Sequence, residues 1–238
     1  MRSARYPRSP HTLRLGLALL VGLLCLLMTA HDGKADGAFV VEDAGVDDPG
    51  KCKVESWAAF ANNRDFIGVV APACVINLGR PVEIAIPVAR VRSEKEWSTD
   101  LVVEAKTPII PFDDDSKFGV ALVGGVGFNL SQGETAAAFV NVPFSFQASE
   151  ALRLDLNVGV LRNLVEDRTV LTWGAGGSLK VTQHVSLIAG AFGFGRKTGG
   201  QVGIRYTPYE KIDFDLGYAR NLEGDRADWV TVGVNLRF

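Results

Sequence analysis

The sequence predicts an all-β protein: a single closed antiparallel transmembrane β-barrel of about 12 strands, preceded by a cleaved signal peptide. Three observations support this fold class. The stretch 228–238 alternates polar and apolar side chains without a break and ends on Phe238. An apolar run at 15–28 follows a basic N-terminus. Alternating segments of strand length fill most of the chain between these two regions.

The N-terminal region has the features of a secretory signal peptide in their usual order. Arginines precede the apolar run 15–28, and Gly33-Lys34-Ala35 follows it as a cleavage site. The run is shorter than the roughly 20 apolar residues of a membrane-spanning helix, so a retained anchor is the weaker alternative. We therefore expect a signal peptide at 1–35, a periplasmic N-terminal segment at 36–51 and an outer-membrane barrel at 52–238.

Cleavage at this point would leave an acidic mature chain. The full chain has 25 Lys and Arg and 27 Asp and Glu; residues 1–35 contain five of these bases and one acid, which leaves 20 and 26. This balance gives no reason to expect nucleic acid as a partner, because phosphate binding needs clustered basic residues. A membrane protein without long apolar helices must be a barrel, whose closure pairs every backbone N–H and C=O.

Alternating segments bounded by turn residues give the expected strands, an even number as in single-chain bacterial barrels. They are 52–61, 66–76, 82–92, 97–107, 118–130, 136–147, 151–163, 168–181, 185–196, 200–207, 211–221 and 228–238. With both termini periplasmic, the short connections 148–151, 182–185 and 207–211 fall on the periplasmic side, and charged connections such as 62–65 and 221–227 fall outside. The connection 108–117 is long for a periplasmic turn.

The alternation also assigns faces to the side chains. We expect an apolar row to face lipid in 151–163 and in 211–221, with charged side chains inward between them. The outward rows are Leu152, Leu154, Leu156, Val158 and Val160, and Ile212, Phe214, Leu216 and Tyr218. A water-soluble β-sandwich would also alternate, but with its apolar rows inside, and is the alternative fold.

The two cysteines of the mature chain are expected to face each other. If the first hairpin turns through 62–64, paired positions sum to 126, so Cys52 lies opposite Cys74. Directly opposed strand positions are close enough for a disulfide, and an exported protein can be oxidised. We expect a disulfide; two reduced thiols that pack as small apolar residues are the alternative.

Charged residues on the inward face are the candidate solute path: Arg153, Asp155, Arg205, Asp213, Asp215 and Arg237. The expected register places Arg205 opposite Asp213, and Asp213 roughly opposite Arg237. Such a row either braces the lumen as a salt-bridge network or lines a path for solute. Over all the expected strands, seven inward acids face five inward bases, which favours at most a weak preference for cations. The acids are Glu55, Glu83, Asp100, Glu104, Asp155, Asp213 and Asp215, and the bases are Lys106, Arg153, Lys180, Arg205 and Arg237.

No catalytic residue, cofactor or metal site is expected. His184 is the only histidine after the predicted cleavage and lies in a short turn. A serine hydrolase of the outer membrane, the second alternative function, would need its histidine on the barrel wall beside a serine. The glycine cluster at 190–195 lacks phosphate-loop spacing. The acidic run at 113–115 lacks the spaced ligands of a calcium loop and is expected to be solvated.

Short motifs resemble those of outer-membrane channels associated with the meta-pathway of phenol degradation. They are Glu42-Asp43 with Pro49-Gly50 and Glu55, residues 104–108, residues 154–159, and residues 203–206 with Asp213, Asp215 and Gly217. The resemblance implies a transport barrel with no catalytic residues and no established ligand. The expected function is therefore a channel or transporter for an unknown small solute, with a purely structural barrel as the alternative.

The end of the chain resembles an outer-membrane assembly signal, with Thr231, Gly233, Leu236 and Phe238 in the polar, glycine, apolar and aromatic positions. The expected partners are therefore outer-membrane lipid and the barrel insertion machinery. Deletion of Phe238 should impair membrane insertion far more than it alters any solute preference. Fractionation and heat-modifiable gel mobility measure this, with Phe238→Tyr as the control; normal membrane levels of the deletion would count against the barrel.

Overall fold

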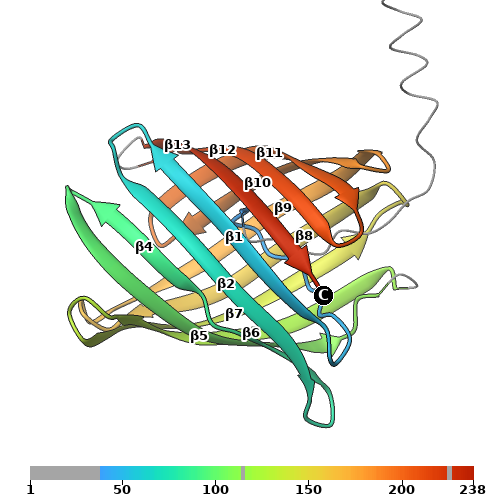
Figure 1. The fold of residues 1–238 in the computed structure, drawn as a ribbon, viewed down its shortest axis with the longest axis horizontal. Helices are drawn as coiled ribbons and strands as arrows, with labels where there is room; N and C mark the ends of the chain where they lie inside the picture. The colour runs from blue at the N-terminus through green and yellow to red at the C-terminus, as the bar shows by residue number, and fades with distance from the viewer. Residues whose placement is uncertain (1–37, 114–115, 224–226) are drawn as a thin grey trace, which may run out of the picture.

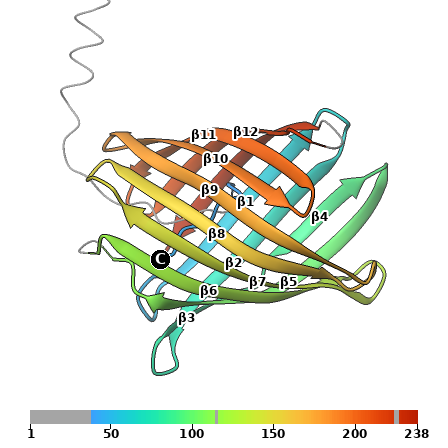
Figure 2. The same ribbon diagram turned by 180° about the vertical axis from the view of Figure 1, so that it is seen from behind.

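The structure is a computed structural model that describes residues 38–113, 116–223 and 227–238 (Figure 1). The predicted signal peptide at 1–35 lies outside the described residues. The described strands form one antiparallel sheet, which closes on itself because β1 pairs with both β2 and β13. Figure 2 shows the opposite wall of the same barrel, formed by β5 to β9.

The strands follow the chain order around the barrel. They are β1 (Cys52–Ala61), β2 (Phe66–Asn77), β3 (Pro81–Ala85), β4 (Val88–Ser93), β5 (Glu96–Ile110), β6 (Phe118–Asn129), β7 (Glu134–Gln147), β8 (Leu152–Asn163), β9 (Arg168–Thr182), β10 (Val185–Phe194), β11 (Lys197–Tyr209), β12 (Ile212–Asn221) and β13 (Asp228–Arg237).

Strands β3 and β4 occupy a single position in the barrel, which therefore has 12 strand positions, as predicted. Both pair with β2 on one side and β5 on the other. The segment expected as one strand at 82–92 is interrupted at Ile86 and Pro87, because proline has no N–H for the ladder. Ile86 N still donates to Pro72 O at 2.9 Å, and Val102 N donates to Pro87 O at 2.8 Å.

The two faces of the sheet have opposite character, as the alternation predicts. On β8, Leu156 is 55% exposed while the neighbouring Asp155 is 4% exposed. The same contrast holds on β12, where Leu216 is exposed and Asp215 is buried. Apolar side chains outside and charged side chains inside are the reverse of a water-soluble sandwich and suit a barrel surrounded by lipid. This outward apolar surface supports the predicted location in the bacterial outer membrane.

Aromatic side chains add to the outward surface. The exposed ones include Trp97, Trp173, Tyr206, Tyr209, Tyr218 and Phe238, and aromatic residues at both membrane interfaces are usual in such barrels. Trp57 is different, because it lines a space inside the barrel. Among the described residues, no helix is both long and apolar enough to cross a membrane.

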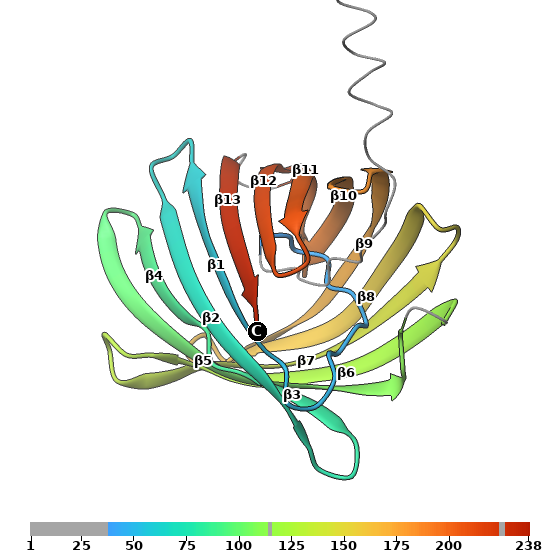
Figure 3. The same cartoon turned by 45° about the vertical axis from the view of Figure 1, so that its right-hand side comes forward.

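The segment before β1 runs inside the barrel. Residues 38–51, the described part of the segment expected at 36–51 in the periplasm, are drawn in blue within the ring of strands in Figure 3. We call residues 38–51 the inner segment. It joins β1 at the end of the barrel where Cys52 and Phe238 exchange backbone hydrogen bonds of 2.9 Å.

The long connection at 108–117 also has a reason in the structure. Its first residues extend β5 to Ile110, and Phe112 then folds back over the sheet. Phe112 forms a buried cluster with Ala44 of the inner segment and Ala121 of β6. A Cβ on Gly119 would lie 2.2 Å from the Cβ of Phe112, so glycine is needed at that position.

The first hairpin has the predicted register, in which Phe60 pairs with Phe66 and Cys52 with Cys74. Cys52 and Cys74 form a disulfide with a Cα–Cα separation of 4.1 Å. The bond links the start of β1 to β2 at the end of the barrel that carries Phe238.

We predict that the mature protein has no free thiol when it is unfolded without reductant, and two after reduction. A thiol assay in denaturant measures both values. Two reactive thiols before reduction would contradict the disulfide, and the Cys52→Ser variant should give one under either condition.

Candidate functional site

The inner segment lies against glycines on the lumen side of the wall. A Cβ on Gly203 would lie 2.5 Å from the ring of Phe39, and a Cβ on Gly190 would lie 3.1 Å from the side chain of Val41. Gly174 and Gly176 approach Val41 in the same way. The absence of side chains at these wall positions gives Phe39 and Val41 the room they occupy.

Side chains of the wall pair with the backbone of the inner segment. Val40 N donates to Gln201 Oε1 at 2.7 Å, and Ala44 N donates to Ser145 Oγ at 2.8 Å. Asn157 makes two such bonds: its Oδ1 accepts from Glu42 N at 2.8 Å, and its Nδ2 donates to Glu42 O at 2.7 Å. These bonds satisfy buried backbone groups of a segment that is not part of the sheet.

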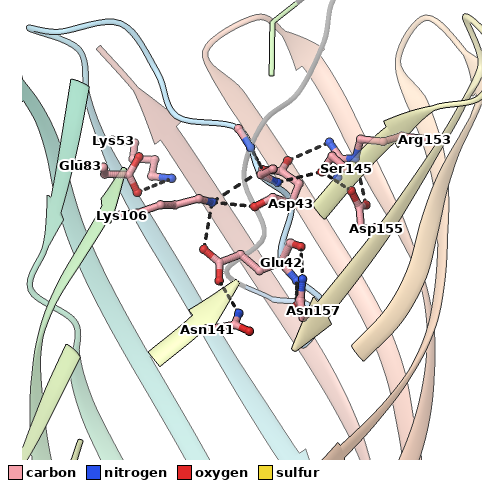
Figure 4. Close-up of polar contacts among 12 residues, drawn as sticks. Glu42, Asp43, Lys53, Glu83, Lys106, Asn141, Ser145, Arg153, Asp155 and Asn157 are labelled. Carbon is pink, nitrogen blue, oxygen red and sulfur yellow. Dashed lines mark hydrogen bonds and ion pairs between the residues drawn. The ribbon is translucent and has the colours of Figure 1, made fainter. Parts of the chain in front are cut away.

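Ion pairs from two strands of the wall, β8 and β5, fix the middle of the inner segment (Figure 4). Arg153 Nη1 of β8 lies 2.8 Å from Asp43 Oδ2, and Lys106 Nζ of β5 lies 2.9 Å from Glu42 Oε1. Lys106 also donates to the backbone oxygen of Asp43 at 2.8 Å. The segment is thereby held from β8 on one side and from β5 on the other.

The charge state of Asp43 follows from these contacts. Burial acts to raise the pKa of its carboxyl, but Arg153, Lys106 and the amide of Gly45 outweigh burial and lower the pKa to about 2. Gly45 N donates to Asp43 Oδ1 at 2.8 Å. Asp43 is therefore ionised at neutral pH, and its negative charge is retained inside the barrel.

The predicted pair Arg153 and Asp155 belongs to this anchor. Arg153 Nε lies 3.0 Å from Asp155 Oδ2, so one guanidinium joins Asp155 to Asp43. Ser145 Oγ donates to Asp155 Oδ1 at 2.6 Å while it accepts from Ala44 N. Arg153 thus contacts the inner segment directly, and Asp155 contacts Arg153 and Ser145, which bind it.

The remaining predicted charges form two pairs, with one correction to the expected register. Arg205 lies opposite Asp215 rather than Asp213, because the β11–β12 pairing is irregular between Tyr206 and Tyr209. Its Nε and Nη2 donate to the two oxygens of Asp215 at 2.7 and 2.9 Å. Arg237 pairs with Asp213, as predicted, although Asp213 is in register with Asn235.

The described residues border two spaces inside the barrel beside the inner segment. The larger, about 530 Å³, lies toward the end that carries the short turns and is lined by Phe39, Val41, Lys180 and His184 among others. The smaller, about 260 Å³, separates the inner segment from the wall of β1 to β5. Its charged lining residues are Glu42, Asp43, Asp47, Glu55, Glu83 and Glu104, with Lys53 and Lys106.

The sequence reasoning missed that the inner segment is part of the site. Of its anchors, Asn157 lies in the motif 154–159, but Gln201 and Ser145 carry no comparable signal, since polar residues are expected on every lumen face. Glycines that recur at lumen-facing positions, such as Gly174, Gly176 and Gly203, were a usable signal. A wall without side chains leaves space for another segment of the chain.

The histidine and the acidic run considered in the sequence lie as follows. Within them, no group of three or more His, Cys, Asp and Glu side chains could hold a metal ion. His184 Nδ1 lies 2.9 Å from the backbone oxygen of Thr207, in the turn where it was expected. Of the acidic run at 113–115, Asp114 and Asp115 lie outside the described residues.

We predict that Asp43→Asn loosens the inner segment. Loss of a charge-assisted contact should weaken its docking by about 2 kcal/mol, about thirtyfold in the opening equilibrium. Hydrogen exchange at the amides of Val40, Glu42 and Ala44 should therefore become faster, also by about thirtyfold. Asp48→Asn, the same change at an exposed position, is the control; equal exchange in all three proteins would contradict the anchor.

We also predict that docking depends on pH through Asp43. Because its pKa is lowered from 3.8 to about 2, its contribution is complete above about pH 4 and is lost as the pH falls through 2. Pepsin cleavage near Phe39, normalised to an unfolded substrate, should rise between pH 3.5 and 2. The Asp43→Asn variant should lack this rise.

Comparisons with known proteins support the fold. No curated protein matches the chain significantly. Among solved structures, the KdgM porin superposes with a TM-score of 0.62 at 10% identity, covering 78% of this chain and 99% of that one. The NanC porin gives 0.59 at 11% identity, covering 77% and 98%. The COG4313 outer membrane channel from Pseudomonas putida F1 gives 0.60 at 14% identity, covering 82% and 98%.

These likenesses are of backbone architecture, since the identities are low. The sequence itself matches a family model over residues 23–238, which is most of the chain. The chain belongs to the family described as uncharacterised conserved protein UCP029691.

Proposed function

We propose that the protein is a bacterial outer-membrane channel that passes a small solute between the inner segment and the wall of β1 to β5. The observation that carries this proposal is the space that the described residues leave inside the barrel. With the inner segment docked, spaces of about 530 and 260 Å³ remain, and both have charged lining residues. A purely structural barrel of this size could fill its interior with side chains.

The charges beside the smaller space favour cations over anions. Lys53 Nζ lies 3.2 Å from Glu55 Oε1 and 3.1 Å from Glu83 Oε1, so one base is shared by two acids. Lys106 is engaged with Glu42 and Asp43 of the inner segment. Glu104 adds a further carboxylate to the same lining. An excess of acids at a narrow point raises the local concentration of cations.

Aromatic side chains give the same space an apolar part. Trp57 of β1 and Phe39 of the inner segment both line it. A small solute with an aromatic or weakly apolar portion would fit this lining, in keeping with the predicted association with phenol degradation. That association stays a prediction, and uptake of phenol by liposomes that contain the protein, compared with empty liposomes, is its test.

Planar-bilayer recording tests the channel itself. We expect discrete conductance steps and, in a salt gradient, a reversal potential of the sign that indicates a weak preference for cations. No channel events from folded, heat-modifiable protein would overturn the channel and favour the structural barrel. Marked selectivity for anions would overturn the proposed path along β1 to β5.

We predict that Glu104→Gln lowers the cation preference without closing the channel. The change removes an ionisable carboxyl group from the lining and keeps the size of the side chain. The permeability ratio of K⁺ to Cl⁻ should fall, on the order of twofold. Glu94→Gln, in the exposed turn between β4 and β5, is the matched control and should leave the ratio unchanged.

A further inference from the structure

A row of aromatic and basic side chains crosses the outer face of β1, β2, β4 and β5. Phe60 pairs with Phe66, Phe66 with Arg92, and Arg92 with Trp97 in the strand registers. The ring centroids of Phe60 and Phe66 lie 5.2 Å apart, and those of Phe66 and Trp97 lie 5.8 Å apart. The four side chains therefore form one continuous surface.

This surface faces away from the lumen. On β4 and β5 the lumen side carries residues such as Pro87 and Glu104, which line the smaller internal space. The alternate positions carry Val88, Arg90 and Arg92 on β4 and Val103, Leu101 and Trp97 on β5. Val88 is 40% exposed and Trp97 is 46% exposed.

The row also lies at the end of the barrel opposite Phe238. The tip of β4 and the start of β5 point away from the C-terminus in Figure 1. Along the outer face from β3 to β4, the apolar Ile84, Ile86 and Val88 are followed by Arg90 and Arg92. With the termini in the periplasm, this change from apolar to basic marks the outer-leaflet interface, where acyl chains give way to headgroups.

Both guanidinium groups are held over the same indole ring. The Cζ atom of Arg90 lies 5.1 Å from the ring centroid of Trp97, and that of Arg92 lies 5.5 Å from it. Arg90 Nη1 donates to Thr99 Oγ1 at 2.7 Å, and Arg92 Nε donates to Arg64 O at 3.0 Å. Each guanidinium has five N–H donors, so these contacts orient the groups and leave capacity for a ligand.

We propose that Arg90, Arg92 and Trp97 form a binding site for an outer-leaflet lipid whose headgroup carries phosphate. Two adjacent guanidinium groups match the oxygens of a phosphate by forked hydrogen bonds. The apolar residues directly below them, Val88 and Leu101, can contact the acyl chains of the same molecule. A phosphorylated lipid therefore contacts both the guanidinium groups and the apolar residues, whereas a soluble anion would contact only the guanidinium groups.

Lipid binding to detergent-solubilised protein tests the proposal. The probes are diphosphorylated lipid A, the same lipid A without its phosphates, and inorganic phosphate, with the dissociation constant taken from native mass spectrometry. We expect lipid A to bind the intact protein about tenfold more tightly than the Arg90→Gln/Arg92→Gln variant, since two charge-assisted contacts are lost. Heat-modifiable mobility shows that the variant is folded.

The matched control is Arg162→Gln. Arg162 lies at the corresponding end of β8 and contacts Thr169 and Asp167, without an aromatic partner in the described structure. It should change lipid A binding by less than about twofold. Equal binding of lipid A to the intact protein and the double variant would overturn the site. Equal binding of dephosphorylated and diphosphorylated lipid A, or full competition by inorganic phosphate, would overturn the assignment to a phosphorylated lipid. All outcomes are independent of channel conductance.

Discussion

Closure of the sheet is the constraint on which the other features of this barrel depend. In lipid, a backbone N–H or C=O without a partner costs several kcal/mol, so the first and last strands must pair. Here β1 and β13 pair along their length, and Cys52 and Phe238 exchange hydrogen bonds at its end. Closure divides the side chains into a lipid face and a lumen face, and the alternation of the sequence follows from that division.

Closure also encloses charged side chains, and each of them needs a partner. Some of these charges pair with a charge on the adjacent strand, as Arg205 of β11 does with Asp215 of β12. Lys106 and Arg153 are instead engaged with Glu42 and Asp43 of the inner segment. An isolated charge in such an interior would be costly, so the acids of the inner segment and the bases of the wall stabilise each other. The inner segment is thus part of the electrostatic balance of the lumen.

The features predicted correctly from the sequence are those that depend on period and pairing alone. Strand positions, the faces of β8 and β12, and the opposition of Cys52 and Cys74 follow from alternation and one hairpin turn. The pairing of Arg205 was wrong, because an irregularity between Tyr206 and Tyr209 shifts the register. The path of residues 38–51 could not be predicted, since its contacts are with side chains of strands distant in the sequence.

The same contacts separate structural charges from those available to a solute. The bidentate bonds of Arg205 use both oxygens of Asp215, which also accepts from Asn235 at 2.9 Å, and all three residues are almost fully buried. Groups so completely paired exchange partners only at a high cost, so a solute gains little by approaching them. The carboxylates on the β1 to β5 side share fewer bases and border an open space. Solute interactions are therefore expected on that side, while the β11 to β13 side holds the closed barrel in register.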